Sequence, residues 1–308
     1  NLKQAWLPEN ADLIPNPIGS AVGFSLSLGN CLVLTTPGVP SELEAMLPTV
    51  TTMLVAAVGG SETYIQRIQT FGVGESTIQQ WANELGDGWP SSVTLGFRAG
   101  LPQLELKLTV ATAEQIPDQK RAYELLVNRF GDHILGEKDA RLAQVVQALL
   151  RDQKKTMTTA ESCTGGLIAS MVTREAGSSA VFEAGLVTYA NSAKNQLLGV
   201  GENVLNTEGA VSEPVVRQML LGALERAGAD IGVAVSGIAG PDGGTADKPV
   251  GTVWIAWGTR EDLRTHRAQI PGSRSLFQGL VAAVALDLIR RHLLGLPALP
   301  HYFTRQAQ

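Results

Sequence analysis

The segment that most constrains the fold of this chain is residues 158–166, which read TTAESCTGG. A β-favouring run at residues 155–160 leads into small hydroxyl residues and two glycines, and the apolar spacing at 167–172 is helical. This order predicts a strand, a tight turn and the start of a helix. Such a turn directs the first N–H groups of the helix, and the positive end of its dipole, toward whatever lies in front of it.

Two hydroxyl residues and two glycines give this turn its chemical interest. Ser162 and Thr164 stand where a nucleophile or a substrate-binding hydroxyl would lie, and Gly165 and Gly166 let a substrate approach the backbone closely. Serine and threonine are also the usual N-cap residues of helices. Spacing alone leaves both interpretations open, because one Ser-x-Thr-Gly-Gly is a weak motif.

The composition is that of a globular protein with more than one domain. The chain has 308 residues, of which 44% are hydrophobic and 17% charged. Its net charge is −5 and it has no long basic run, which argues against a nucleic-acid-binding surface. The sequence has neither a signal peptide nor an apolar run of transmembrane length, so we expect no membrane partner.

The cysteines and the first residue bear on the origin of the chain. Cys31 and Cys163 fall in different candidate domains, so a disulfide is not expected and a reducing cytoplasm fits best. The chain begins with Asn1 rather than methionine, and we expect it to be a fragment of a longer protein.

The pattern along the chain predicts three parts. Residues 1–60, with a strand at 31–35 and a helix at 41–55, form the tail of one domain. Residues 61–135 form a small α+β domain. Its expected elements are a strand at 65–70, a helix at 75–85, a hairpin of 93–98 and 103–109, and a helix at 113–130 interrupted near Pro117.

From residue 136 to residue 308 helices and strands alternate, which predicts a layered α/β domain. The expected helices are 139–152, 165–174, 192–198, 213–227 and 273–294. The expected strands are 156–160, 184–189, 231–235, 251–258 and 264–270.

Ser162 needs a neighbouring base to act as a nucleophile. None of the histidines (His133, His266, His292 and His301) lies in a glycine-rich turn, and no metal-ligand spacing is present. Lys194 lies just past a strand end, at the sheet edge where the turns after residues 160 and 235 should open. A desolvated lysine there can act as a general base. Spacing alone favours the other interpretation, a solvated lysine in the first turns of a helix.

A second glycine-rich loop, residues 236–245 (SGIAGPDGGT), follows a buried-type strand. Its backbone N–H groups could hold a phosphate. It lacks the Gly-Lys-Ser/Thr ending of a P-loop, and no strong helix follows it as in the dinucleotide fingerprint. Lys248 and Arg274 are candidate partners for a phosphate or carboxylate, although each alone is typical of a surface charge.

Taken in order, several motifs resemble the C-terminal domain of the CinA family. They are AESCTGG (160–166), AGSS (176–179), VTYANSAK (187–194), GAVSE (209–213), SGIAGPDGGT (236–245) and KPVGTV (248–253). TFGVGES (70–76) resembles the KH-like middle domain of long CinA proteins. NPIG (16–19) and PGVPSE (37–42) resemble the end of a molybdopterin-binding-like α/β domain. The resemblance implies a three-layer α/β C-terminal domain at 136–308, a KH-like α+β domain at 61–135 and a molybdopterin-binding-like remnant at 1–60.

The resemblance also implies an activity, hydrolysis of the carboxamide of nicotinamide mononucleotide to nicotinate mononucleotide and ammonia in pyridine-nucleotide salvage. It implies no metal or other cofactor, a Ser162/Lys194 pair and a homodimer. For the mechanism we expect the N–H groups of residues 164–166, at the helix N-terminus, to hold the oxyanion. From composition and position within these motifs, we expect the substrate-binding residues to be Glu161, Thr164, Gly165, Gly166, Tyr189, Asn191, Ser236, Gly237, Ala239, Gly240, Gly243, Gly244 and Arg274.

The chain departs from the family pattern in both glycine-rich regions. Asp242 stands where glycine is expected, Ser236 replaces threonine, and Ser273 replaces aspartate before Arg274. A carboxylate at Asp242 would weaken phosphate binding unless it points away. One alternative is therefore a nucleotide-binding, competence-linked regulator without turnover. Another is an ADP-ribose-processing hydrolase, but the motifs that it needs would precede Asn1.

Overall fold

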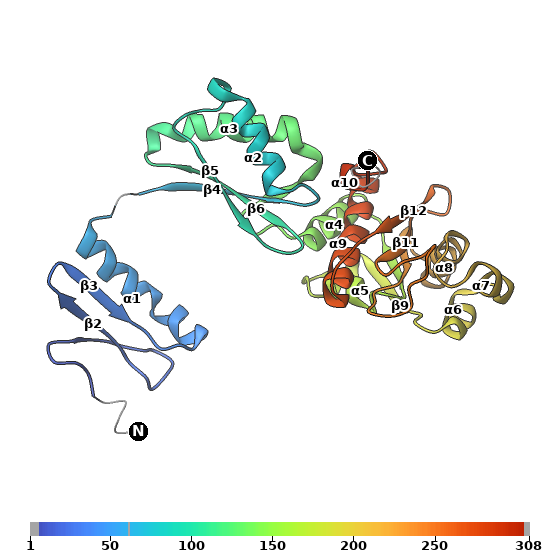
Figure 1. Cartoon of the computed structure of the whole chain (residues 1–308), viewed down its shortest axis with the longest axis horizontal. Helices are drawn as coiled ribbons and strands as arrows, with labels where there is room; N and C mark the ends of the chain where they lie inside the picture. The colour runs from blue at the N-terminus through green and yellow to red at the C-terminus, as the bar shows by residue number, and fades with distance from the viewer. Residues whose placement is uncertain (1–5, 61, 305–308) are drawn as a thin grey trace. The chain divides into compact units, whose positions relative to one another are not determined.

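The computed structural model describes residues 6–60 and 62–304 (Figure 1). The chain divides into two compact units, Asn1–Thr63 and Tyr64–Gln308. The domain boundary expected after residue 135 lies inside the second unit and stays a prediction. The mixture of several sheets and helices confirms the α/β class.

The first unit is an antiparallel sheet with one helix. Strands β1 (Asp12–Ile14), β2 (Gly23–Leu28) and β3 (Cys31–Thr35) pair in that order, and α1 (Pro40–Val58) follows. Met46 on α1 packs with Ile14 in a small core. The strand expected at 31–35 and the helix expected at 41–55 are present, whereas β1 and β2 were not predicted individually.

Helix α1 bears on the membrane question. By length and composition alone it could cross a membrane, and 11% of its apolar window is buried. The expectation that no run reaches transmembrane length therefore fails for this helix. A single helix of this kind is weak evidence, because helices that never meet a membrane satisfy the same criterion.

The second unit opens with a four-stranded antiparallel sheet in the order β5-β6-β4-β7. Its strands are β4 (Tyr64–Thr70), β5 (Thr94–Ala99), β6 (Leu104–Val110) and β7 (Ile134–Glu137). Helices α2 (Glu75–Glu84) and α3 (Ile116–Phe130) bury Ile78 and Leu126 against this sheet. The expected hairpin is confirmed. Pro117 does not interrupt a helix, because it lies in the first turn of α3, where no backbone N–H is needed.

The rest of the second unit is built on a five-stranded sheet in the order β12-β11-β10-β8-β9. Strand β8 lies between β9 and β10 and is parallel to both, whereas β11 pairs antiparallel with β10, and β12 pairs antiparallel with β11. The strands are β8 (Met157–Glu161), β9 (Phe182–Val187), β10 (Ile231–Gly237), β11 (Thr252–Gly258) and β12 (Leu263–Gln269). Every residue of β8 is buried, as expected for the central strand of a parallel arrangement.

Helices cover both faces of this sheet and make three layers (Figure 1). One core contains the apolar sides of α4 (Leu142–Asp152), α5 (Leu167–Thr173) and α9 (Arg274–Leu293). The other contains those of α6 (Asn191–Leu198), α7 (Glu202–Glu208) and α8 (Glu213–Ala227). Helix α7 was not predicted.

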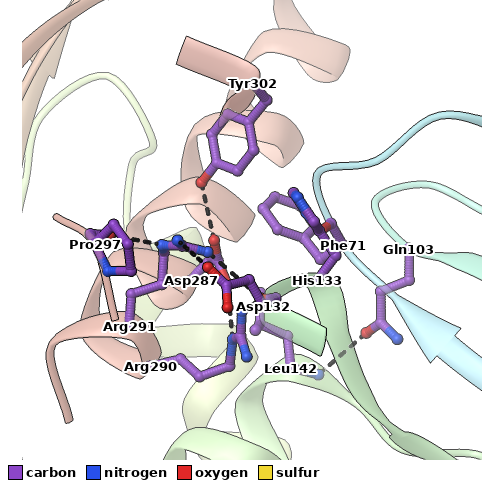
Figure 2. A network of polar contacts seen from close by, with 10 residues as sticks. All are labelled: Phe71, Gln103, Asp132, His133, Leu142, Asp287, Arg290, Arg291, Pro297 and Tyr302. Carbon is purple, nitrogen blue, oxygen red and sulfur yellow. Dashed lines mark hydrogen bonds and ion pairs between the residues drawn. The ribbon is translucent and has the colours of Figure 1, made fainter. Parts of the chain in front are cut away.

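The C-terminal half of α9 carries a buried polar network (Figure 2). Asp287 is 1% exposed and accepts hydrogen bonds from Arg290 Nε at 2.8 Å and from the Tyr302 hydroxyl at 3.0 Å. Arg291 Nη2 pairs with Asp132 Oδ2 at 3.2 Å, and Arg290 donates to the Asp132 carbonyl. Tyr302 belongs to α10 (His301–Thr304). The network thus fixes α9 to the 3₁₀ turn Gly131–His133 that precedes β7.

Candidate active site

Three loops meet at one edge of the five-stranded sheet. The loops that follow β8, β9 and β10 all leave from the carboxyl ends of parallel neighbours, and Glu161 at the end of β8 pairs with Val187 of β9 and Val235 of β10. Ligands of α/β sheets collect at this edge. The sequence-predicted site residues of all three loops are therefore on the same side of the domain.

Ser162 and Lys194 lie within hydrogen-bond distance at this edge. Lys194 Nζ is 3.1 Å from Ser162 Oγ. Both side chains are buried, with 8% of Ser162 and 1% of Lys194 exposed. The interpretation of Lys194 as a solvated surface lysine is therefore wrong, and a dyad of the predicted composition is geometrically in place.

Lys194 is enclosed by backbone acceptors and by the Ser162 hydroxyl, and its burial shifts its pKa toward the neutral form. Its Nζ donates to the carbonyls of Thr188 at 2.9 Å and Tyr189 at 3.2 Å. Burial lowers the pKa of Lys194, and in the described part of the chain no carboxylate lies within ion-pair distance of it. A neutral amine has two N–H donors, which the two carbonyls take up, and its lone pair then faces the Ser162 hydroxyl. This is the arrangement that a general base for Ser162 requires.

Glu161 lies under the turn and caps α5. Its fully buried carboxylate accepts bonds from the backbone N–H of Gly166 at 3.0 Å, Ile168 at 3.0 Å and Ala169 at 2.8 Å. The Thr164 hydroxyl donates to the same carboxylate at 2.7 Å. The implied role of Glu161 in substrate binding does not fit this geometry, because its oxygens already serve the turn.

The same contacts decide the helix-cap question. Gly166 is the N-cap of α5, with φ of 99°, and no hydroxyl caps the helix. The interpretation of Ser162 or Thr164 as the cap is therefore wrong. Thr164 instead uses its hydroxyl on Glu161, so this hydroxyl does not point freely at a substrate.

Two of the three expected oxyanion donors are already engaged. Gly165 N–H donates to the Ser162 carbonyl at 3.1 Å, and Gly166 N–H donates to Glu161. Within the described residues, the N–H groups of Cys163 and Thr164 have no hydrogen-bond partner. We expected the N–H groups of residues 164–166 to hold an oxyanion. Those with no other acceptor are the N–H groups of residues 163 and 164.

The second loop is connected to Tyr189 through Arg274 in the first turn of α9. Arg274 Nη1 donates to the Gly240 carbonyl at 2.9 Å, and Nη2 donates to the Tyr189 hydroxyl at 2.8 Å. Arg274 itself is exposed. The guanidinium therefore lies between the loop after β10 and the loop after β9, with a side open to solvent.

The remaining predicted residues of these loops differ in accessibility. Ser236 is 1% exposed and donates to the Ala210 carbonyl at 2.7 Å, so it fixes the loop rather than presenting a free hydroxyl. Lys248 Nζ donates to the Glu208 carbonyl at 2.9 Å. This hydrogen bond is separate from those that Arg274 makes with Gly240 and Tyr189. The other predicted positions divide into buried or half-buried Gly237, Ala239 and Gly240 and exposed Asn191, Gly243 and Gly244.

Sequence reasoning missed Gln278. Its Nε2 donates to the Cys163 carbonyl at 2.8 Å and so ties the nucleophile turn to α9. Gln278 stands four residues after Arg274 in the same helix, and this spacing places both on one face. That spacing was the available signal.

Cys163 is not a second nucleophile. Burial raises its pKa to about 12, so the thiol remains protonated, and it packs in the core below the turn. Among residues 6–60 and 62–304, no three His, Cys, Asp or Glu side chains gather closely enough to hold a metal ion.

Comparison with known proteins gives a consistent set of relatives. The family model described as the CinA C-terminal domain matches residues 139–293. A CinA-like protein of Colwellia psychrerythraea is 45% identical over 100% of this chain and 72% of its own length. One from Shewanella loihica is 41% identical over 98% of this chain and 72% of its own length. The crystal structure of the competence/damage inducible protein CihA from Agrobacterium tumefaciens is 44% identical, covering 48% of this chain and 91% of that chain, with a TM-score of 0.47.

Proposed function

Because this chain belongs to the CinA family, we propose that it is a nicotinamide-nucleotide amidohydrolase, which converts nicotinamide mononucleotide and water into nicotinate mononucleotide and ammonia. The observation that carries the proposal is the buried contact of 3.1 Å between Ser162 Oγ and Lys194 Nζ. A serine becomes nucleophilic when an adjacent base removes its proton, and a desolvated lysine supplies that base.

The first half-reaction forms an ester on Ser162. Its Oγ attacks the carboxamide carbon while the hydroxyl proton passes to the lone pair of Lys194. The carboxamide oxygen gains the negative charge and accepts hydrogen bonds from the N–H groups of Cys163 and Thr164, which have no other acceptor among the described residues. The C–N bond then breaks, and the nitrogen leaves as ammonia with the proton that Lys194 received.

The second half-reaction releases the acid. Lys194, neutral again, takes a proton from water as the water oxygen attacks the ester carbon. The bond to Ser162 Oγ breaks and the proton returns from Lys194 to that oxygen. The product is the carboxylic acid of nicotinate mononucleotide, which ionises to the carboxylate as its proton passes through solvent to the released ammonia, and the enzyme regains its starting protonation state.

The nucleotide part of the substrate has a basic contact in the proposal. Arg274 is exposed, and its two partners, the Tyr189 hydroxyl and the Gly240 carbonyl, are both uncharged. Its positive charge is therefore available to bind a phosphate. Tyr189, whose carbonyl accepts from Lys194, lies on the loop after β9, and Asn191 begins α6; both would position the ring. A homodimer in the cytoplasm remains part of the proposal.

The test is ammonia release from nicotinamide mononucleotide by the purified chain without added metal. Turnover should be lost in Lys194→Ala and in Ser162→Ala, while nucleotide binding by Ser162→Ala should persist. Full turnover by Ser162→Ala would refute the nucleophile. Binding without turnover by the unmodified chain would favour the alternative of a nucleotide-binding regulator. The feature that supports this alternative is the exposed carboxylate of Asp242 in the second loop.

A further inference from the structure

Glu161 is an unusual carboxylate in its surroundings. It is fully buried, and in the described part of the chain no lysine, arginine or histidine pairs with it. A buried charge without a counter-ion is costly unless hydrogen-bond donors replace water. Glu161 has five such donors, three backbone N–H groups and two hydroxyls, which belong to Thr159, Thr164, Gly166, Ile168 and Ala169.

These donors lie on both sides of Ser162 in the sequence. Thr159 precedes Ser162, and the other four donors follow it. The carboxylate therefore closes the turn from below, and the turn itself contributes two backbone bonds, from Gly165 N–H to the Ser162 carbonyl and from Leu167 N–H to the Thr164 carbonyl. The direction in which Ser162 Oγ points depends on this closure.

The main chain of Glu161 reaches the other member of the dyad. Its carbonyl accepts a bond of 2.8 Å from Thr188 N–H, and the Thr188 carbonyl in turn accepts from Lys194 Nζ at 2.9 Å. One residue thus holds the serine turn with its side chain and the lysine acceptor with its backbone.

The charge of Glu161 also stays separate from Lys194. The carboxylate is directed at the first N–H groups of α5, whose positive partial charges balance it. A carboxylate directed at Lys194 would instead stabilise the ammonium form and remove the base.

We propose that Glu161 is a positioning residue that holds Ser162 and its flanking N–H groups in line with Lys194, without touching the substrate. This inference rests on the proposed function for its kinetic readout but not for its chemical one. It predicts that loss of the carboxylate lowers the reactivity of Ser162 and leaves nucleotide affinity unchanged.

The first variant is Glu161→Gln, which keeps the shape but places an NH₂ group opposite backbone N–H donors. We expect kcat to fall at least tenfold with KM within twofold of the unmodified chain. Phenylmethylsulfonyl fluoride gives a readout independent of the nucleotide, because it forms a sulfonate ester on an activated serine and releases fluoride. Mass spectrometry should show labelling at Ser162 that slows in parallel with kcat.

The matched control is Glu175→Gln, just beyond the other end of α5. Glu175 is 8% exposed and pairs with Arg141 at 2.8 Å, so the same chemical change is made in a similarly buried carboxylate. Labelling and kcat should stay within twofold in this variant. A comparable loss in Glu175→Gln would overturn the inference, since the effect would then be one of general stability.

A second pair of variants covers the case in which Glu161→Gln does not fold. Thr164→Val removes one donor to the carboxylate, and Thr164→Ser retains it. We expect labelling of Ser162 to slow severalfold in the valine variant and recover in the serine variant, with KM unchanged in both. A raised KM at constant kcat would make Thr164 a substrate contact and overturn the inference.

Outcomes of the two proposals remain distinguishable. If the unmodified chain is labelled at Ser162 but does not hydrolyse nicotinamide mononucleotide, the proposed function fails while the labelling rates still test the positioning role. If Ser162 of the unmodified chain is not labelled, no activated serine exists to be positioned and the inference is wrong.

Discussion

Gln278 Nε2 donates to the Cys163 carbonyl across 2.8 Å and so connects the nucleophile turn to the longest helix of the second unit. The same helix carries Arg274 at its first turn and the buried Asp287 network in its last turns (Figure 2). The position of the turn that follows β8 therefore depends on a helix more than a hundred residues later in the chain.

The contact between Gln278 and Cys163 can be tested by Gln278→Leu. Loss of one neutral hydrogen bond should lower the free energy of unfolding by about 1 kcal/mol. We expect kcat to fall by about tenfold with little change in KM, because small displacements of reacting groups are costly. Urea denaturation and steady-state kinetics measure the two effects.

Gln153→Leu is the matched control for that variant. Gln153 Nε2 donates to the Leu293 carbonyl at 2.8 Å, a bond of the same type at the opposite end of α9. Its stability loss should be similar and its kcat unchanged. Equal losses of kcat in both variants would show that Gln278 has no special effect on the turn.

The proposed base predicts the pH dependence of activity. Lys194 must be neutral to accept the Ser162 proton, and burial lowers its pKa from the usual 10.5. The value of kcat/KM should therefore increase with pH through one ionisation below 10.5, because Lys194 loses its proton there. A kcat/KM that stays constant or decreases as the pH is raised toward 10.5 would exclude Lys194 as the base.

The same pKa shift predicts how stability depends on pH. Between the lowered pKa of Lys194 in the folded protein and its ordinary value in the unfolded chain, the unfolded chain binds more protons, so the free energy of unfolding rises with pH. Below the folded pKa the penalty for charging the buried amine is fully present. Chemical denaturation at several pH values should show a smaller rise in Lys194→Met, and identical slopes would contradict the assignment.

The Asp287 network predicts a stability effect without an effect on the chemistry. Asp287→Asn leaves the 2% exposed Arg290 with no charged partner on α9, so we expect a loss of about 3–5 kcal/mol in the free energy of unfolding. Tyr302→Phe removes one hydrogen bond to Asp287 and should cost less, about 1 kcal/mol.

Asp262→Asn is the control for the Asp287 variant. Asp262 also pairs with an arginine, Arg264, at 2.8 Å, but the carboxylate side chain is 51% exposed. Solvent screening makes such a pair weak, so thermal unfolding should change little. Equal destabilisation by the two substitutions would mean that burial does not determine the strength of the network.

The sequence predicted the parts of this site that follow from local pattern. The β8 strand, the turn and α5 were expected from a β-favouring run, two glycines and helical spacing. Lys194 was a candidate base from its place just beyond a neighbouring strand, but spacing alone favoured a solvated lysine, and the pairing with Ser162 came from the family resemblance. Parallel strands bring their carboxyl ends to one edge, so the proximity of Ser162 and Lys194 follows from topology once the strands are known.

The missed features depend on tertiary contacts. Whether the Glu161 carboxylate points to a substrate or under α5 is set by how the turn packs, which the sequence letters do not show. Short elements such as α7 and β1 are stabilised by neighbours rather than by their own propensity, and this explains their absence from the prediction. Gln278 is separated from Cys163 by most of the domain, so no local pattern connects them.

Arg274 is expected to bind the phosphate of the substrate. Arg274→Met should raise KM for nicotinamide mononucleotide by about 10- to 100-fold, because a hydrogen bond to a charged group contributes about 1.5–3 kcal/mol. KM for nicotinamide riboside, which has no phosphate, should change far less. Arg264→Met, which removes a half-buried arginine held by Asp262, should alter neither value. Equal losses for the two substrates in Arg274→Met would indicate that Arg274 acts only by holding Tyr189 and the Gly240 loop, since both substrates need those contacts alike.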